Sequence, residues 1–440
     1  MKIKSYTPIF ILILGIIPLS IIINPDVIPR FLGEISHLDK GGYLDLEHYI
    51  NISQRGREYA WQTAFYPLWP FVLSVINRFS SIDSYKISIF TSIFFGISSL
   101  LISKRIFKKI SRNNINSSIS WSLYVLSPMT IFLFNGYTES IFAFFTWILM
   151  ALIINAIEKE YKYIFSINYI FIFIISCILG LTRPSIIQAF ISISIALILT
   201  LILYKQKAEM PSNIYIYLSI YIALGFFIGY LIYGLICIND GYRFLEPFYS
   251  QQLWQKSLGF RPILFLTSRS AIVNYWGLYY PFIIIIAFLN KINLFAPQLK
   301  IINSIFFKNT FLTILYTPIG FIYGLSNLRN IKNKNTYLKN NLNKDTNNYI
   351  QKYIYLFLFS SFFAFSHSLI CLFTCEISLM SLGRFVFGQP YFYVAFSILI
   401  NAMDKEEIKY KKLFFIITLM ISGFILLENF IDFGNAKLHV

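Results

Sequence analysis

The sequence predicts an all-α protein that crosses a membrane several times, and three observations lead to that prediction. Hydrophobic residues make up 57% of the 440 residues, whereas soluble domains are about 45–50% apolar. Charged residues make up 13% of the chain, about half the usual share. Apolar runs long enough to cross a bilayer recur along the sequence. Because so much apolar surface has to face lipid, we expect a polytopic membrane protein that forms one domain over residues 1–440.

Charge and aromatic content narrow the kinds of partner. The net charge is +17, and in a membrane protein such basic residues gather in cytoplasmic loops and contact anionic lipids. No basic soluble region is present to bind nucleic acid, so that class of partner is excluded. Aromatic residues make up 19% of the chain, which suits membrane interfaces and surfaces that stack on sugars.

Run length predicts where the spans lie. The first, Pro8–Ile23, follows Lys2 and Lys4 and precedes no small-residue cleavage site, so we expect an uncleaved span with a cytoplasmic N-terminus. We place the ambiguous run Ile272–Leu289 in the membrane interface, because the charge parity of the loops then holds. The total is about eleven crossings. The remaining spans are expected at Ile87–Ser103, Ile119–Phe134, Ile141–Ile157, Ile164–Leu181, Ser185–Leu203, Ile214–Ile238, Phe311–Asn327, Tyr353–Phe373, Phe385–Ile400 and Leu413–Leu427.

Basic residues predict the orientation of these spans. The connection 104–112 is strongly basic, and the loop 328–352 is rich in Lys and Asn, so both are expected in the cytoplasm. The opposite face then receives residues 24–86 as a first outer, catalytic loop. It also receives residues 238–310 as an outer loop with interfacial helices. The segment Phe65–Phe79 is apolar but short and interrupted by proline, so we expect a re-entrant or interfacial helix there.

The outer stretch Leu44–Pro70 is the centre of the functional prediction. It holds Asp45, Glu47 and His48 within one helical turn. Asp45 and His48 are three residues apart and would share one face of a helix. A carboxylate held just outside a membrane can take a proton from an acceptor hydroxyl. The alternative is an acidic side chain on a solvated loop, which is the usual place for carboxylates.

Two arginines fall at span ends on the outer face, where basic residues are disfavoured. An arginine within hydrocarbon costs about 2.5–3.5 kcal/mol, and less at a span end, where the side chain reaches the interface. Arg183 and Arg384 are therefore either interface anchors or ligands of an anion, and a lipid phosphate is the obvious anion. Glu139 follows Thr138 at an expected span start, where Thr138 can cap the helix and a carboxylate favours the positive end of its dipole.

The sequence gives no support for a metal or nucleotide site. The four cysteines lie in or beside apolar runs and imply no disulfide framework. His367, Cys371 and Cys375 recur at a spacing of four, but no further ligand accompanies them, and free cysteine is a common buried residue. Neither a phosphate-binding glycine loop nor a nucleophile elbow is present.

Five groups of residues follow one another along the outer connections. They are Asp45–Tyr49 with Gly56 and Phe65–Pro70; Ser127-Pro128 with Asn135–Phe142; Gly180–Ser185; Gln251–Trp254; and Ser381–Phe385. Together they resemble the motifs of the PIG-V-like mannosyltransferases, a family that includes the enzyme adding the second mannose to glycosylphosphatidylinositol precursors, and bacterial relatives. The chain departs from the family pattern at Leu44, where tryptophan is usual, at Thr138, where serine is usual, and at Phe385, where tyrosine is usual.

The resemblance implies a multi-span helical bundle of the GT-C type with its active site on the non-cytoplasmic face. The donor would be a polyprenyl- or dolichyl-phosphate sugar, typically mannose, and one displacement would invert the anomeric centre. Asp45 would be the general base, His48 would orient it or contact the acceptor, and Glu139 would bind sugar hydroxyls or tune Asp45. Arg183 and Arg384 would hold the departing phosphate, so no metal cofactor is required. Gln251 and Trp254 suit sugar recognition by hydrogen bonding and ring stacking.

Other functions fit the same composition. A lipid or sugar transporter or flippase would also be polytopic and basic, but it often carries charges near the bilayer midplane, and here the expected spans hold almost none. A protein O-mannosyltransferase-like enzyme and a scaffold subunit of an enzyme complex are further alternatives. The expected partners are membrane lipids, the lipid-linked donor and a glycolipid or glycan acceptor, with a small membrane subunit left open. The membrane would be bacterial plasma membrane or endoplasmic reticulum.

Overall fold

The computed structural model describes residues 7–31, 44–159, 165–206, 213–254, 256–261, 272–291, 344–375, 379, 381–402 and 411–435. Within these ranges the chain is helical, and the single bridge between Lys256 and Cys375 is isolated. Six of the described helices are long and apolar enough to cross a membrane. They are α6 (Ser84–Ile110), α8 (Glu139–Lys159), α10 (Ile186–Gln206), α11 (Ile214–Asn239), α17 (Lys344–Thr374) and α20 (Lys411–Gly434). The prediction of a helical membrane protein is confirmed.

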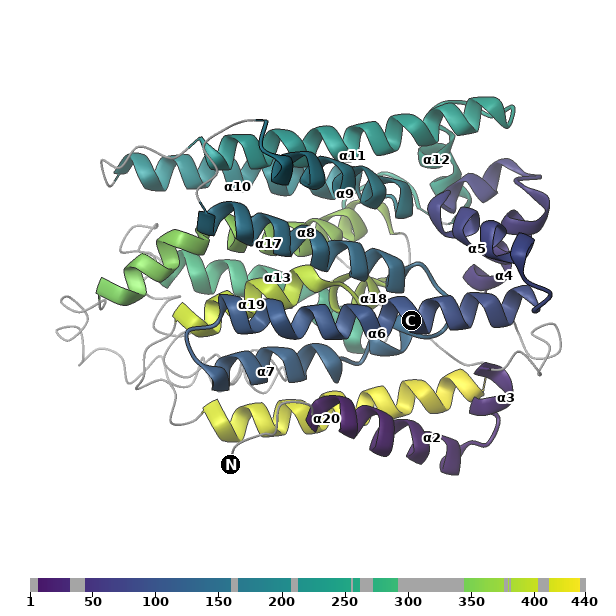
Figure 1. Ribbon diagram of the computed structural model, residues 1–440, viewed down its shortest axis with the longest axis horizontal. Coiled ribbons are helices and arrows are strands. Elements are labelled where there is room, and N and C mark those ends of the chain that lie inside the picture. Colours follow the sequence, from purple (N-terminus) through teal and green to yellow (C-terminus); the bar gives the residue numbers. More distant parts are fainter. Residues whose placement is uncertain are drawn as a thin grey trace.

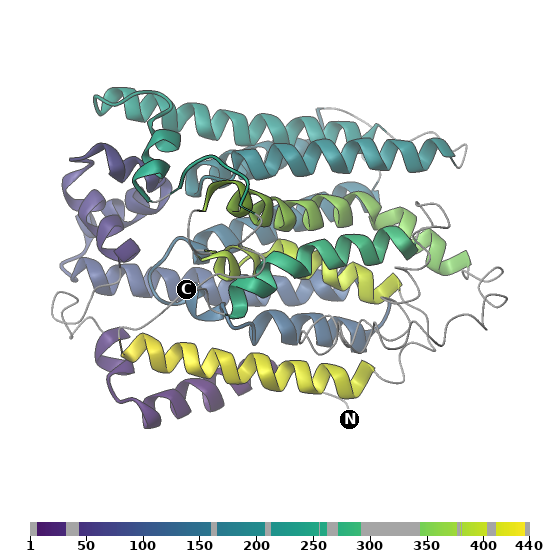
Figure 2. The same cartoon turned by 180° about the vertical axis from the view of Figure 1, so that it is seen from behind.

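The long helices lie side by side and run the length of the molecule (Figures 1 and 2). Shorter apolar helices run beside them: α7 (Asn114–Val125), α9 (Ile167–Thr182) and α19 (Pro390–Ala402). Helices α9 and α11 pack closely, because small residues let their backbones approach. A Cβ atom on Gly229 would lie 2.4 Å from the Cys177 carbonyl oxygen, and one on Gly180 would lie 2.9 Å from the Phe226 carbonyl oxygen. Substitution of either glycine would therefore force the two helices apart.

The first and last helices of the chain pack together along one side of the bundle. The helical turns α1 (Thr7–Ile11), η1 (Leu12–Ile16) and α2 (Ile17–Ile23) form a continuous stretch, followed by the short α3 (Val27–Phe31). Asn24 joins them to α20, because its Nδ2 donates to the Ile431 carbonyl at 3.0 Å and to Asn435 Oδ1 at 3.1 Å. The expected first span is thus a helix whose far end is tied to the far end of α20.

Helix α13 (Ile272–Lys291) differs from the interfacial helix expected at Ile272–Leu289. It lies lengthwise within the bundle beside α17 and α19 (Figure 2). Ser368 Oγ donates to the Gly277 carbonyl at 2.8 Å, and the buried Tyr280 ring packs on Phe387 and Phe392. Aromatic and apolar side chains that suit an interface are here buried between helices instead. The described residues therefore do not support the count of eleven crossings, and the expected span Phe311–Asn327 lies outside them.

One end of the bundle is held together by lysines, and we call it the lysine end. Lys109 on α6 and Lys352 on α17 contact Glu158 on α8, with nitrogen–oxygen distances of 2.7 and 3.5 Å. Tyr349 Oη donates to the Ile110 carbonyl at 2.7 Å. The basic connection 104–112 and the start of α17 therefore lie at the same end, as charge parity predicted.

The opposite end, which we call the site end, is capped by short helices. They are α4 (Leu44–Arg55), η3 (Ala60–Ala64), α5 (Leu68–Phe79), η4 (Thr130–Leu133), α12 (Glu246–Tyr249), η5 (Ser250–Trp254) and α18 (Leu382–Phe387). Helix α5 is the short helix expected within Phe65–Phe79, and it packs against α4, α6 and α9. The expected outer connections converge here: segments far apart in sequence, near residues 45, 139, 183 and 384, come into contact.

Candidate functional site

A chain of ion pairs lies at the site end and joins four separate parts of the sequence. Arg384 Nη1 contacts Asp45 Oδ2 at 2.8 Å, and Arg384 Nε also donates to Glu139 Oε1. Arg183 Nη1 contacts the same Glu139 oxygen at 2.8 Å. We call Asp45, Arg384, Glu139 and Arg183 the ion chain. Its two guanidinium groups and two carboxylates balance in charge, so the group as a whole is neutral.

Helix α4 presents Asp45 to this chain. Asp45 and Glu47 lie in the first helical turn, where carboxylates favour the positive end of the helix dipole. Leu46, Tyr49 and Ile52 are buried, and their spacing of three anchors one face of the helix against the bundle. Asp45 stays partly accessible, with 30% of its side chain exposed, so it is the member of the ion chain that a molecule outside the bundle can reach.

Glu139 begins α8 and follows a strained turn. Gly136 has φ of +85°, a conformation that side chains disfavour, and its carbonyl accepts from Trp69 Nε1 and Ser88 Oγ, each at 2.9 Å. The motif around Trp69 thus fixes the turn that delivers Glu139. The Glu139 side chain is fully buried, and within the described residues its Oε2 has no hydrogen-bond partner. Its role extends beyond the local helix-dipole effect, because both arginines depend on it.

Arg384 sits on α18, a helix held at its start by two features. Ser381 adopts the left-handed conformation with φ of 56°, and the Gly383 amide donates to Asn274 Oδ1 of α13 at 2.7 Å. The Arg384 guanidinium carbon lies 4.8 Å from the Phe132 ring centroid and 4.5 Å from that of Tyr137. Aromatic faces stabilise a guanidinium in place of water.

Arg183 lies in the turn between α9 and α10, and aromatic rings also lie against its guanidinium group. Its guanidinium carbon is 4.8 Å from the Phe385 ring centroid and 5.9 Å from that of Phe142. Both arginines keep only about a tenth of their side chains exposed. A buried charge that loses its partner costs about 3–5 kcal/mol, so the four groups have to be present together.

His48 is placed next to the ion chain but outside it. Its ring packs edge-on against Trp61 at 4.8 Å between centroids and tilted against Phe65 at 5.0 Å. Burial lowers the pKa of His48 below its ordinary value, and the nearby Asp45 carboxylate opposes that shift. The imidazole is therefore neutral near pH 7. Burial, with Asp45 adding to it, raises the pKa of Tyr49 on the same helix, so its hydroxyl stays protonated.

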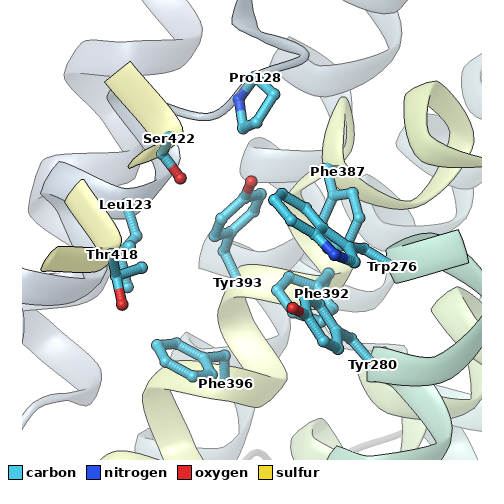
Figure 3. Close-up of a pocket in the computed structure, with 10 residues that line it drawn as sticks. All are labelled: Leu123, Pro128, Trp276, Tyr280, Phe387, Phe392, Tyr393, Phe396, Thr418 and Ser422. Carbon is cyan, nitrogen blue, oxygen red and sulfur yellow. The ribbon is translucent and has the colours of Figure 1, made fainter. Parts of the chain in front are cut away.

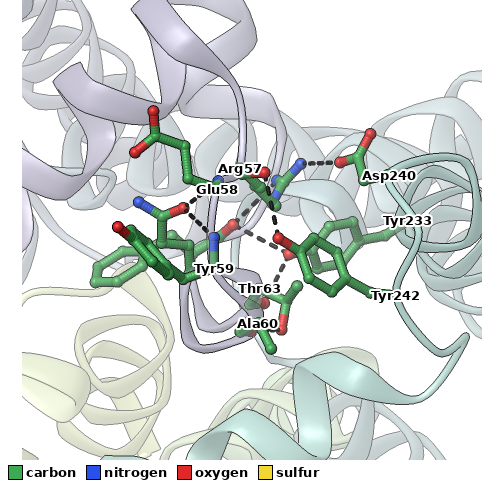
Figure 4. Close-up of polar contacts among 10 residues, drawn as sticks. Arg57, Glu58, Tyr59, Ala60, Thr63, Tyr233, Asp240 and Tyr242 are labelled. Atoms are coloured by element: carbon green, nitrogen blue, oxygen red, sulfur yellow. Dashed lines mark hydrogen bonds and ion pairs between the residues drawn. The ribbon is translucent and has the colours of Figure 1, made fainter.

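A second polar cluster, which sequence reasoning missed, clamps the outer segment 57–65 to α11 (Figure 4). Arg57 Nη1 contacts Asp240 Oδ2 at 3.2 Å, and Arg57 Nη2 donates to the Phe65 carbonyl at 3.2 Å. Tyr233 Oη donates to the Thr63 and Phe65 carbonyls at 2.6 and 3.1 Å. Because Phe65 also supports His48, this clamp determines the position of the aromatic wall beside Asp45. A lone arginine and a tyrosine within an apolar helix gave no sequence signal.

The two residues expected to recognise sugar are in η5. Gln251 Oε1 accepts from Lys256 Nζ at 2.9 Å, and Lys256 is within electrostatic range of His367 on α17. Trp254 ends η5, and its side chain lies outside the described residues. Within the part of the chain that the structure describes, no member of the ion chain contacts Gln251, which lies on the His367 side of the site.

A small cavity elsewhere in the bundle does not belong to the site. It has a volume of about 50 Å³ and is lined by aromatic side chains of α13, α18 and α19, with Thr418 and Ser422 of α20 opposite them (Figure 3). No charged residue lines it, and its volume would hold only a few water molecules. We interpret it as incomplete packing between α20 and the rest of the bundle.

The geometry suits a reaction in which negative charge moves. Two buried guanidinium groups can stabilise a developing phosphate charge, and an accessible carboxylate lies beside them. Among the described residues, no group of three His, Cys, Asp or Glu side chains could hold a metal ion. In comparisons with known proteins, no family model matches the chain and no curated protein matches it.

Proposed function

We propose that the protein is a glycosyltransferase of the PIG-V-like, GT-C type that uses a lipid-phosphate sugar as donor. The donor would be polyprenyl- or dolichyl-phosphate mannose, and the acceptor a hydroxyl of a glycolipid or glycan. The single observation that supports this best is the ion chain, which pairs an accessible carboxylate with two buried arginines at one end of an apolar bundle. A lipid carrier would place its phosphate at such an end, on the non-cytoplasmic face.

In the proposed reaction the acceptor oxygen attacks the anomeric carbon while Asp45 takes the hydroxyl proton. The bond from the anomeric carbon to the phosphate oxygen breaks, and the configuration inverts. The lipid phosphate leaves with one additional negative charge, which Arg183 and Arg384 stabilise. Such positioned charge is often the largest contribution to the rate.

The pairing of Asp45 with Arg384 adds a consequence for the order of events. Phosphate oxygens on the donor can accept hydrogen bonds from the same Arg384 N–H groups that contact Asp45, so donor binding would free the Asp45 carboxylate for the acceptor hydroxyl. We therefore expect the donor to bind before the acceptor is deprotonated.

The test is transfer of radiolabelled mannose from polyprenyl-phosphate mannose to a membrane glycolipid extract, with the protein reconstituted in vesicles. Asp45→Asn keeps the shape but removes the base, and we expect transfer to fall by roughly 10²–10⁴. Glu47→Gln on the same helical turn is the matched control and should retain transfer. Near-normal turnover by Asp45→Asn would remove the proposed base.

The rival functions are separated by changing the readout. A flippase would move the labelled lipid across the vesicle membrane without transferring its mannose to any acceptor. A protein O-mannosyltransferase-like enzyme would label peptides rich in serine and threonine in place of the glycolipid extract. Transport without transfer by the wild-type protein would contradict the proposed function.

A further inference from the structure

Three buried polar side chains from three different segments lie together on the His367 side of the site. Gln188 is on α10, His367 on α17, and Gln389 immediately precedes α19. Gln188 Nε2 lies 3.4 Å from His367 Nδ1, and the Gln389 side chain approaches the same ring. The three residues are 6%, 8% and 2% exposed, respectively. We call them the Gln–His–Gln group.

The Gln–His–Gln group adjoins the ion chain across one aromatic ring. The His367 ring stacks on Phe385 at 5.9 Å between centroids, and the Arg183 guanidinium carbon lies 4.8 Å from the same ring. Phe385 follows Arg384 directly and is only half-buried. Phe385 and the Gln–His–Gln group are therefore next to the Arg183 guanidinium on this side of the site.

Among the described residues, three polar atoms of this group make no hydrogen bond of ordinary geometry: Gln188 Oε1, His367 Nε2 and Gln389 Oε1, the last on a side chain that lies close to the His367 ring. Buried polar atoms are rarely left unpaired. With the Gln188 amide nitrogen placed as a donor toward Nδ1, the ring proton is assigned to Nε2. The group thus offers one donor and two acceptors, and none of its three side chains carries a charge.

This arrangement of one donor and two acceptors favours an uncharged ligand that carries hydroxyl groups. Two amide oxygens repel an anion, and the nearby Arg183 repels a cation. A hydroxyl group can accept from Nε2–H and donate to an amide oxygen at once, so neighbouring hydroxyls on a neutral ring satisfy all three atoms. Lys256 brings Gln251, the residue expected to recognise sugar, to the same side.

We propose that Gln188, His367 and Gln389 form the subsite for the hexosyl ring of the lipid-linked donor. This inference rests on the proposed function, because it places the sugar next to the phosphate held by the ion chain. It separates two tasks: the arginines bind the phosphate of any lipid phosphate, and the Gln–His–Gln group distinguishes a carrier that bears a sugar from one that does not.

The experiment measures binding of two probes to the full-length protein in nanodiscs: polyprenyl-phosphate mannose and sugar-free polyprenyl phosphate. The variants are Gln188→Leu and His367→Leu, which keep approximate size and remove the polar atoms. The controls are Ser192→Ala and Ser366→Ala, whose hydroxyls bond only to their own helices. We expect each variant to bind the mannosylated lipid about tenfold more weakly, to bind the sugar-free lipid as the wild type does, and the controls to change neither.

Several outcomes would overturn the inference. Equal weakening for both probes would assign the group a structural, water-filled role, and so would a loss of thermal stability with unchanged discrimination between the probes. Transfer activity with undiminished mannosyl-lipid binding in both variants would remove this subsite while leaving the proposed function intact. Conversely, a His367-dependent preference for the mannosylated lipid without transfer would keep the subsite and contradict the transferase. If the wild type binds neither lipid, both proposals fail.

Discussion

Each end of helix α8 carries a glutamate that contacts two basic side chains. At the site end Glu139 joins two cations, Arg183 and Arg384, and at the lysine end Glu158 joins Lys109 and Lys352. Glu139 is fully buried and its arginines are about nine-tenths buried, whereas Glu158 is 23% exposed and its lysines more than 40% exposed. The same helix therefore has one dry and one solvated ion cluster.

Solvent exposure determines how strongly the charges in each cluster can act. Exposed pairs are screened by water and salt and contribute about 0–1 kcal/mol. The ion pairs at the lysine end therefore add little to stability, and they mark which end of the bundle carries the basic residues. Arginine forks set against aromatic rings are held in one geometry and act in a low dielectric. Such a cluster costs stability to assemble, and its charges are held in fixed positions before any ligand binds.

The comparison predicts its largest effect for neutralising each glutamate. Glu139→Gln leaves two buried guanidinium groups with Asp45 as their remaining carboxylate, and we expect it to cost about 3–5 kcal/mol. Glu158→Gln should cost less than about 1 kcal/mol. The measurement is the midpoint of thermal unfolding in detergent for both variants. Equal losses would show that the two clusters do not differ in kind.

Exchanging the cations is the next test. Arg384→Lys keeps the charge but cannot reach Asp45 and Glu139 through separate nitrogens of one fork, so we expect mannosyl transfer to fall by roughly ten- to a hundredfold. Lys109→Arg at the lysine end should leave transfer unchanged. Initial rates at saturating acceptor give the comparison. Full activity of Arg384→Lys would mean that charge alone, without fork geometry, is sufficient.

The sequence predicted which residues gather at the site end more accurately than it predicted the position of helix α13. Asp45, Glu139, Arg183 and Arg384 were expected on one face because charge parity fixes the sidedness of connections, and the structure brings all four into contact. Parity could not place Ile272–Leu289, since an apolar, tyrosine-bearing run suits both an interface and a buried helix. Burial of Tyr280 among Phe387 and Phe392 depends on tertiary packing that no local pattern encodes.

Other parts of the site gave weak signals for a physical reason. The Gln–His–Gln group is formed by residues of different segments, Gln188, His367 and Gln389. In the sequence each of them is only an isolated polar residue in an apolar run. The clamp formed by Arg57 and Tyr233 acts through backbone carbonyls, which every residue has. The pairing of Asp45 with Arg384 spans 339 residues and becomes visible only once the helices are placed.

Tyrosine hydroxyls provide a matched test of rigidity at the two ends. Tyr233→Phe removes hydrogen bonds to the Thr63 and Phe65 carbonyls, and Tyr349→Phe removes one to the Ile110 carbonyl. Each should lower local stability by about 1 kcal/mol. We expect Tyr233→Phe to speed amide hydrogen exchange in 57–65 and to reduce transfer modestly, and Tyr349→Phe to affect only the lysine end. Exchange that rises at both ends in either variant would contradict separate local units.

The smallest expected effect is a dependence on pH confined to the site end, where His48 lies. Burial lowers the pKa of His48 in the folded protein, whereas in the unfolded chain it is about 6.5. As pH falls from 7 to 5, the unfolded chain therefore takes up the proton first, and stability falls. The contribution is complete above the unfolded pKa and is lost as pH falls through the folded one.

The matched variant is His48→Gln, which keeps a polar side chain but does not titrate in this range. We expect the unfolding midpoint of the wild type to fall more steeply between pH 7 and 5 than that of the variant. The contacts of Glu158 with Lys109 and Lys352 include no imidazole, so the protection factors of amide hydrogens near them should stay unchanged over this range. Parallel midpoint curves for the two proteins would mean that the aromatic wall of Trp61 and Phe65 accommodates a charged imidazole as readily as water does.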